Sequence, residues 1–250
     1  MEKILEFYNG YDEDTRLTTR HITEFVVTTY YLDGIIKPRF HILDATAGTG
    51  IYSLYYAGKG CTVEAMDIVP HHIKTIEQRF DKTNFNITAM VGDACDLKHY
   101  PSEEFDVVLN MGAVYHIEKQ NISGCLRENI RVLKPGGYLV IAYINKYAGY
   151  ENDKFATFFN FHSPAEIEEY VMALNMRIIE HVPTDGDIYV AIENKSSNSS
   201  SNQQGFKEKQ FWLEENLPQY HSWLDENIAE RDIHTIREKF VHALLIARKP

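Results

Sequence analysis

Glycines and carboxylates stand at spacings that could bind a nucleoside-bearing cofactor. Residues 40–50 read FHILDATAGTG, an apolar run followed by a turn that contains Gly48 and Gly50. Glycine lets backbone N–H groups and the start of a helix approach a ligand closely. Asp67 ends the next apolar run, twenty-three residues beyond Asp44. In a doubly wound sheet such a carboxylate can accept hydrogen bonds from a ribose diol, so this pattern predicts a nucleoside site.

A parallel sheet must bring these residues together, and the alternating apolar pattern between residues 40 and 145 predicts one. Strands are expected at residues 40–43, 61–66, 87–91, 105–110 and 138–144. Helices are expected between them, and Pro135-Gly136-Gly137 is expected to end the last of these helices. Residues 176–182 and 240–247 are expected to form a closing antiparallel pair. The predicted fold class is α/β, a Rossmann-like doubly wound sheet, mostly parallel with a C-terminal antiparallel hairpin strand.

Composition and charge narrow the functional classes. The chain has 250 residues and a net charge of −11, which disfavours nucleic acid because such binding neutralises phosphates with Lys and Arg. No apolar run is long enough to span a membrane, and the first residues do not resemble a signal peptide. The three scattered cysteines and the spacing of the histidines predict neither disulfide nor metal site. We therefore expect a cytoplasmic protein with a small-molecule substrate and no metal.

Four motifs in this order resemble the class I S-adenosylmethionine-dependent methyltransferases, over residues 38–145 and again at the C-terminal strand pair. They are ILDATAGTG, the acid of AMD, VGDA, and RVLKPGGYLVIAY. The resemblance is greatest to small bacterial methyltransferase-domain proteins. It implies that S-adenosyl-L-methionine is the cofactor and that one domain spans residues 1–250. Its expected parts are an N-terminal helical lid (1–35), a cofactor-binding core (36–145), a substrate-side insertion with helices (146–235) and a closing strand (236–250).

The resemblance also implies roles for individual residues. Asp44 would orient the amino group of the cofactor, and Gly48 and Gly50 would leave room for its sulfonium and amino-acid portion. Asp67 would bind the ribose, and Asp93 would meet the adenine. The full set of residues assigned to the cofactor is Asp44, Ala45, Thr46, Gly48, Gly50, Asp67, Ile68, Asp93, Ala94, Asn110, Met111, Tyr11 and Arg16.

Thr46 departs from the family pattern, because it replaces the usual first glycine of the turn. A β-branched residue tolerates this turn poorly if its φ angle is positive. Thr46 is therefore the main argument for a fold that has lost cofactor binding.

Tyr115 and His116 follow the fourth expected strand, where related enzymes carry a similar pair facing the transferred methyl group. His116 could deprotonate a substrate hydroxyl or amine; alternatively, Tyr115 packs and His116 only bonds a neighbouring loop. Tyr11 could cover the sulfonium, and Arg16 could pair with the cofactor carboxylate. The same stretch would equally fit a solvated helix start. The pair His71-His72, beside Asp67, is expected at the surface.

The preferred function is transfer of a methyl group from S-adenosylmethionine to an O, N or S nucleophile of a small molecule. The first alternative is a non-catalytic protein that binds the cofactor as a sensor or scaffold. An RNA methyltransferase is disfavoured by the charge and by Met111-Gly112 after Asn110, where an Asn-Pro-Pro-Tyr-type motif would be needed. A nicotinamide-dependent dehydrogenase is disfavoured because Ser53 stands where its last glycine should be.

Overall fold

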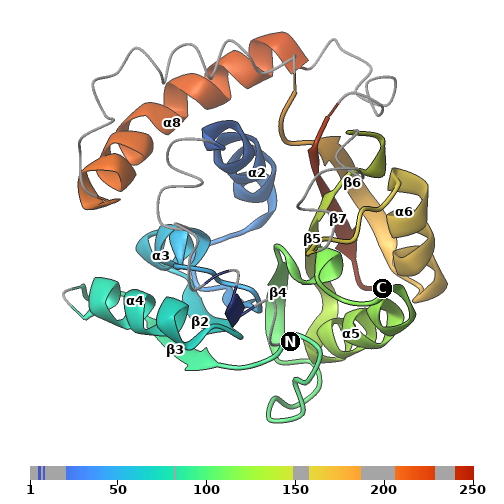
Figure 1. The fold of residues 1–250 in the computed structure, drawn as a ribbon. Coiled ribbons are helices and arrows are strands. Elements are labelled where there is room, and N and C mark those ends of the chain that lie inside the picture. Colours follow the sequence, from blue (N-terminus) through green and yellow to red (C-terminus); the bar gives the residue numbers. More distant parts are fainter. Residues whose placement is uncertain are drawn as a thin grey trace.

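A seven-stranded sheet is the framework of the part of the chain that the computed structural model describes (Figure 1). The described residues are 5, 6, 8, 21–81, 83–148, 158–186, 206–228 (206–214 by backbone alone) and 240–250. The strands are β1 (His41–Asp44), β2 (Thr62–Asp67), β3 (Ile87–Val91), β4 (Phe105–Asn110), β5 (Leu133–Ile144), β6 (Arg177–Pro183) and β7 (His242–Arg248).

The sheet has the order β3-β2-β1-β4-β5-β7-β6. The first five strands in the chain pair in parallel, and β7 runs antiparallel between β5 and β6. This arrangement confirms the predicted doubly wound sheet with an antiparallel C-terminal hairpin. Because β1, β2, β3 and β4 are parallel, their carboxyl ends meet at one edge, where ligands of open α/β sheets bind.

Helices cover both faces of the sheet (Figure 1). Residues of α2 (Ile22–Ile35), α3 (Ile51–Gly58), α4 (Pro70–Phe80) and α8 (Phe206–Ile228) form one core with the sheet. Residues of α5 (Lys119–Val132) and α6 (Pro164–Ala173) form the other core. Two single turns, η2 (Ala113–Tyr115) and η3 (Lys146–Ala148), follow β4 and β5. No helix among the described residues is long and apolar enough to cross a membrane.

The start of β5 differs from the prediction. The helix before it ends at Val132 and the strand begins at Leu133, so Pro135-Gly136-Gly137 lies inside the strand. The pairing of β4 with β5 shifts register at this point. Gly137 fits there because a Cβ atom would lie 2.9 Å from the carbonyl oxygen of Asp106. The sequence placed these residues after the helix correctly but did not show that the strand continues through them.

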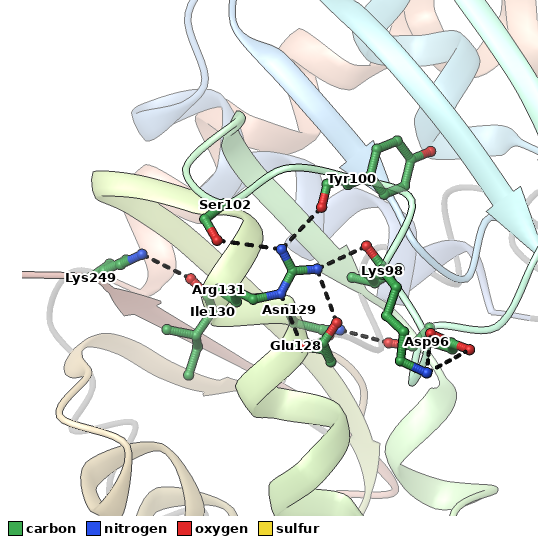
Figure 2. A network of polar contacts seen from close by, with 11 residues as sticks. Asp96, Lys98, Tyr100, Ser102, Glu128, Asn129, Ile130, Arg131 and Lys249 are labelled. Atoms are coloured by element: carbon green, nitrogen blue, oxygen red, sulfur yellow. Dashed lines mark hydrogen bonds and ion pairs between the residues drawn. The ribbon is translucent and has the colours of Figure 1, made fainter.

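Side chains of α5 fix the segment that follows β3 (Figure 2). The guanidinium group of Arg131 donates to the backbone carbonyls of Leu97 at 2.8 Å and Tyr100 at 3.0 Å. Two positions earlier, the amide of Asn129 donates to the carbonyl of Ala94 at 2.8 Å. These bonds give the loop after β3 a set position at the carboxyl edge of the sheet.

Candidate active site

A cavity of about 580 Å³ opens at the carboxyl ends of the parallel strands, within the usual size range of small-molecule sites. Its walls come from the loops after β1 (45–49), β2 (67–69), β3 (92–95) and β4 (111–113), and from the residues that follow η2. Tyr8, from the N-terminal part of the chain, also lines it. The cavity therefore lies where the sequence placed the nucleoside site.

Asp67, at the end of β2, is the best-anchored carboxylate of the cavity wall. Its Oδ2 accepts a hydrogen bond from the backbone N–H of Gly48 at 2.8 Å, and its Oδ1 accepts one from Val69 at 2.9 Å. The ring Nδ1 of His72 lies 3.1 Å from the same Oδ1. Asp67 thus joins the turn after β1 to the start of α4 while its side chain faces the cavity. The ribose assignment itself remains a prediction.

Asp44 lies beside the cavity, and Ala45 begins the wall. Its Oδ2 accepts a hydrogen bond from the hydroxyl of Ser53 at 2.6 Å, whereas its buried Oδ1 has no hydrogen-bond partner among the described residues. Burial raises the pKa of the Asp44 carboxyl to about 7, and the charge of Asp67 adds to this. A positively charged ligand nearby would stabilise the ionised form. The cationic end of S-adenosylmethionine fits this requirement.

The charge of the cavity wall is negative. Its charged residues are Asp67, Asp93 and Glu118, and no Lys or Arg stands among the wall residues that the structure describes. A negative, partly enclosed site favours a cation and disfavours the pyrophosphate of a nicotinamide dinucleotide. The wall therefore agrees with a sulfonium cofactor better than with NAD.

Thr46 does not strain the turn after β1. Among the described residues, the non-glycine residues with positive φ are Arg39, Glu103 and Asn175, so Thr46 is outside this group. Its hydroxyl oxygen accepts a hydrogen bond from the backbone N–H of Met111 at 2.7 Å. This bond joins the loop after β1 to the end of β4, and both residues line the cavity. The departure from the glycine pattern adds a contact and does not close the site.

The two glycines of the turn have different roles. Gly48 lines the cavity with a φ of 55°, a left-handed conformation that glycine adopts without strain. Gly50 does not line it: φ is 88°, and an added Cβ would lie 2.8 Å from Cγ1 of Ile76. The prediction that Gly50 leaves room for the cofactor is therefore corrected, since the space it leaves is filled by α4.

Asn110 was predicted to contact the cofactor, but it does not line the cavity. Its side chain is fully buried, donates to Oδ1 of Asn129 at 2.8 Å and accepts from the N–H of Ala113 at 3.1 Å. It supports the turn after β4, whereas the cavity wall at this point is formed by Met111. The other predicted contacts that lie on the wall are Ala45, Ile68, Asp93 and Ala94.

His116 and Tyr115 line the cavity together with Tyr8. Nδ1 of His116 lies 3.2 Å from the carbonyl oxygen of Phe158. Because a carbonyl only accepts, Nδ1 carries the proton, and Nε2 accepts a hydrogen bond from the hydroxyl of Tyr8 at 2.9 Å. Burial lowers the pKa of His116 to about 4. The ring is therefore neutral at neutral pH, with its acceptor nitrogen directed to Tyr8. The rings of Tyr115 and Phe159 pack around it.

Tyr8 and His72 are among the cavity residues that escaped the sequence analysis. Tyr8 is brought to His116 across 108 positions of the chain, a contact that no spacing reveals. His72 was expected at the surface, and this expectation is wrong: the residue is 2% exposed, whereas His71 is exposed as expected. His72 lies in the first turn of α4, on the side that faces Asp67. The predicted Tyr11 and Arg16 lie outside the described residues.

Comparisons with known proteins agree with this geometry. Residues 43–141 match the family described as a methyltransferase domain. A demethylmenaquinone methyltransferase from Tropheryma whipplei is 35% identical over 100 residues, 40% of this chain and 40% of that enzyme. A phosphoethanolamine N-methyltransferase from Zea mays is 30% identical over 124 residues, 49% of this chain and 24% of that enzyme. A protein solved from Pyrococcus horikoshii has the same fold, with a TM-score of 0.65 and 16% identity over 98% of this chain and 99% of its own.

The strand order and the cavity define a Rossmann-like fold of the methyltransferase type. Over residues 43–141 the chain is similar to methyltransferase domains. The chain spans less than half the length of the two curated relatives described above.

Proposed function

We propose that the chain is a methyltransferase that moves a methyl group from S-adenosylmethionine to an O, N or S nucleophile of a small molecule. The observation that carries the proposal is the negatively charged cavity, whose wall joins Asp67 and Asp93 to a histidine with a defined acceptor nitrogen. The names of the curated relatives, which refer to a quinone precursor and to phosphoethanolamine, support a small acceptor.

When bound, S-adenosylmethionine supplies a methyl group activated by a positively charged sulfur. Asp67 would hold the ribose, Asp93 and the backbone of Ala94 would meet the adenine, and Asp44 would balance the positive charge. Each of these groups is held by hydrogen bonds within the protein, such as the bond from the N–H of Gly48 to Asp67 at 2.8 Å and the bond from the N–H of Cys95 to Asp93 at 2.8 Å. A wall already set in this way loses little freedom on binding, which favours affinity.

His116 is the residue best placed to align the acceptor. Its unprotonated Nε2 can accept a hydrogen bond from a substrate hydroxyl or amine in place of the Tyr8 hydroxyl, or through it. With a pKa of about 4, His116 is a weak base. Its contribution is therefore alignment of the nucleophile, and Nε2 is the atom that can take up the proton the nucleophile loses as it gains the methyl group.

The test is transfer of labelled methyl from S-adenosylmethionine to a panel of amines, phenols and thiols that includes phosphoethanolamine and a demethylated quinone. We expect a labelled product from at least one class. His116→Ala should lower turnover about a hundredfold, the lower end for a positioned acid–base group, without changing the affinity for S-adenosylhomocysteine. Tyr8→Phe removes only the hydroxyl and shows whether this group relays or blocks the acceptor.

The exposed His99 gives a matched control. His99→Ala should leave both turnover and cofactor affinity unchanged. Tight cofactor binding with no transfer to any class of acceptor would contradict the proposal and favour the non-catalytic alternative. Equal turnover in His116→Ala and the unaltered chain would make His116 structural.

A further inference from the structure

A second group of polar side chains lies outside the cavity wall, at the start of α2 and β7. His21 immediately precedes α2, Glu24 lies in its first turn, and His242 is the first residue of β7. One ligand atom from each of the three lies within 4.8 Å of the others. The rings of His21 and His242 also contact edge to face, with centroids 5.1 Å apart. The fold thus brings together groups separated by more than two hundred positions.

Each member of the group has a reason for its place. His21 and Glu24 are three positions apart at the start of a helix, a spacing that sets two side chains on the same side. Ile144 is opposite His242 in the β5–β7 pairing, so His242 lies at the carboxyl edge of the sheet. The side chain of Glu24 is enclosed, and the residue is 4% exposed.

Asp185 fixes the orientation of His242. Its Oδ2 lies 2.5 Å from Nδ1 of His242, and its Oδ1 accepts from the N–H of Val241 at 2.8 Å. A carboxylate that holds one ring nitrogen sets the tautomer in which the other nitrogen, Nε2, carries no proton and can bind a metal. This carboxylate–histidine arrangement is the usual support of a metal-binding histidine.

We propose that His21, Glu24 and His242 bind one divalent transition-metal ion, zinc being the best match to two imidazoles and one carboxylate. Asp185 is the positioning residue for His242. Three protein ligands leave one coordination position of a four-coordinate ion for water or another group. The ion would tie the start of α2 to β7. The proposal is independent of the methyl-transfer reaction.

The test uses the full chain, first treated with a chelator to remove bound metal and then freed of the chelator. Titration calorimetry with Zn²⁺ should show one site, and Co²⁺ should give the visible absorption of a nitrogen- and oxygen-ligated ion. His21→Ala and His242→Ala should abolish the site, and Asp185→Asn should weaken it about ten- to a hundredfold. Added zinc should raise the melting temperature of the unaltered chain but not of these two alanine variants.

Another cluster of possible metal ligands, His41, Glu64 and Glu104, lies at the opposite edge of the sheet and provides the matched control. His41→Ala should leave zinc binding unchanged. Loss of binding in His41→Ala with retention in His242→Ala would overturn the assignment, as would the absence of any zinc binding. Glu24→Gln, which preserves volume, covers the case in which an alanine variant does not fold: a folded Glu24→Gln chain with undiminished zinc affinity also contradicts the proposal.

Discussion

Asp67 connects three parts of the cavity wall through one carboxylate. It accepts from the N–H groups of Gly48 and Val69 and contacts His72, which has a buried Nε2 without a hydrogen-bond partner among the described residues. The carboxylate is therefore held rigidly at the position where the ribose is expected. Its loss should affect both the ligand and the turn after β1.

We predict that Asp67→Ala weakens binding of S-adenosylhomocysteine tenfold or more. One hydrogen bond to a charged group contributes about 1.5–3 kcal/mol, which corresponds to at least this factor. Titration calorimetry gives the comparison, with His71→Ala as an exposed control in the same segment. An unchanged affinity in Asp67→Ala would remove the ribose assignment.

Asp44 and His116 should give opposite dependences of stability on pH. The pKa of Asp44 is raised to about 7, so between pH 4 and pH 7 the folded chain retains a proton that the unfolded chain releases. This contribution to stability is lost as the pH rises. The pKa of His116 is lowered to about 4, so between pH 4 and pH 6.5 the unfolded chain binds the extra proton. This contribution is lost as the pH falls.

Single variants should therefore separate the two slopes. In Asp44→Asn the free energy of unfolding should increase between pH 4 and pH 6.5 more steeply than in the unaltered chain. In His116→Gln the free energy of unfolding should increase less with pH over the same interval than it does in the unaltered chain. Each difference should reach about 3 kcal/mol, since one pKa unit corresponds to 1.36 kcal/mol. Denaturant unfolding at several pH values measures both, and parallel profiles in all three chains would refute these protonation states.

At the scale of elements, α5 positions two loops of the cavity. Asn129 donates to the carbonyl of Ala94 after β3 and accepts from Asn110 at the end of β4. Arg131 holds the same segment further along, at the carbonyl of Leu97 and at the carbonyl of Tyr100 (Figure 2). The adenine side of the cavity thus depends on a helix that contributes few of its own side chains to the wall.

Asn129→Ala should consequently reduce both stability and cofactor affinity. The change removes the hydrogen bonds of Asn129 to the buried amide of Asn110 and to the carbonyl of Ala94. The loss of each bond should lower the free energy of unfolding by about 1–3 kcal/mol. A lower melting temperature and weaker binding of S-adenosylhomocysteine are expected by thermal unfolding and calorimetry. Gln120→Ala, an exposed change on the same helix, should alter neither. If Asn129→Ala were as stable as Gln120→Ala, the supporting role of α5 would be wrong.

At the scale of the whole molecule, the sequence predicted the sheet well because its strands are short apolar runs between strong turn signals. Strands β3 and β4 have the predicted bounds, and the antiparallel C-terminal pair is confirmed. The predicted start of β5 was wrong. Pro135-Gly136-Gly137 commonly follows a helix end, and only the pairing with β4 shows that these residues lie inside the strand.

The cavity was predictable only in part. Positions that follow strands, such as Asp67 and Asp93, could be placed because the topology of a parallel sheet determines where its loops meet. Tyr8 and His72 could not, because the first depends on a contact across the chain and the second on which side of α4 faces the sheet. The same limit applies to His21 and His242, which have no meaningful spacing in sequence.

The most direct test of the account is calorimetric titration of the full chain with S-adenosylmethionine and S-adenosylhomocysteine, with NAD as the comparison. The negative cavity with its anchored Asp67 predicts micromolar binding of the first two and no binding of NAD. Binding of NAD, or of none of the three, would contradict the assignment of this cavity to an S-adenosylmethionine-dependent methyltransferase.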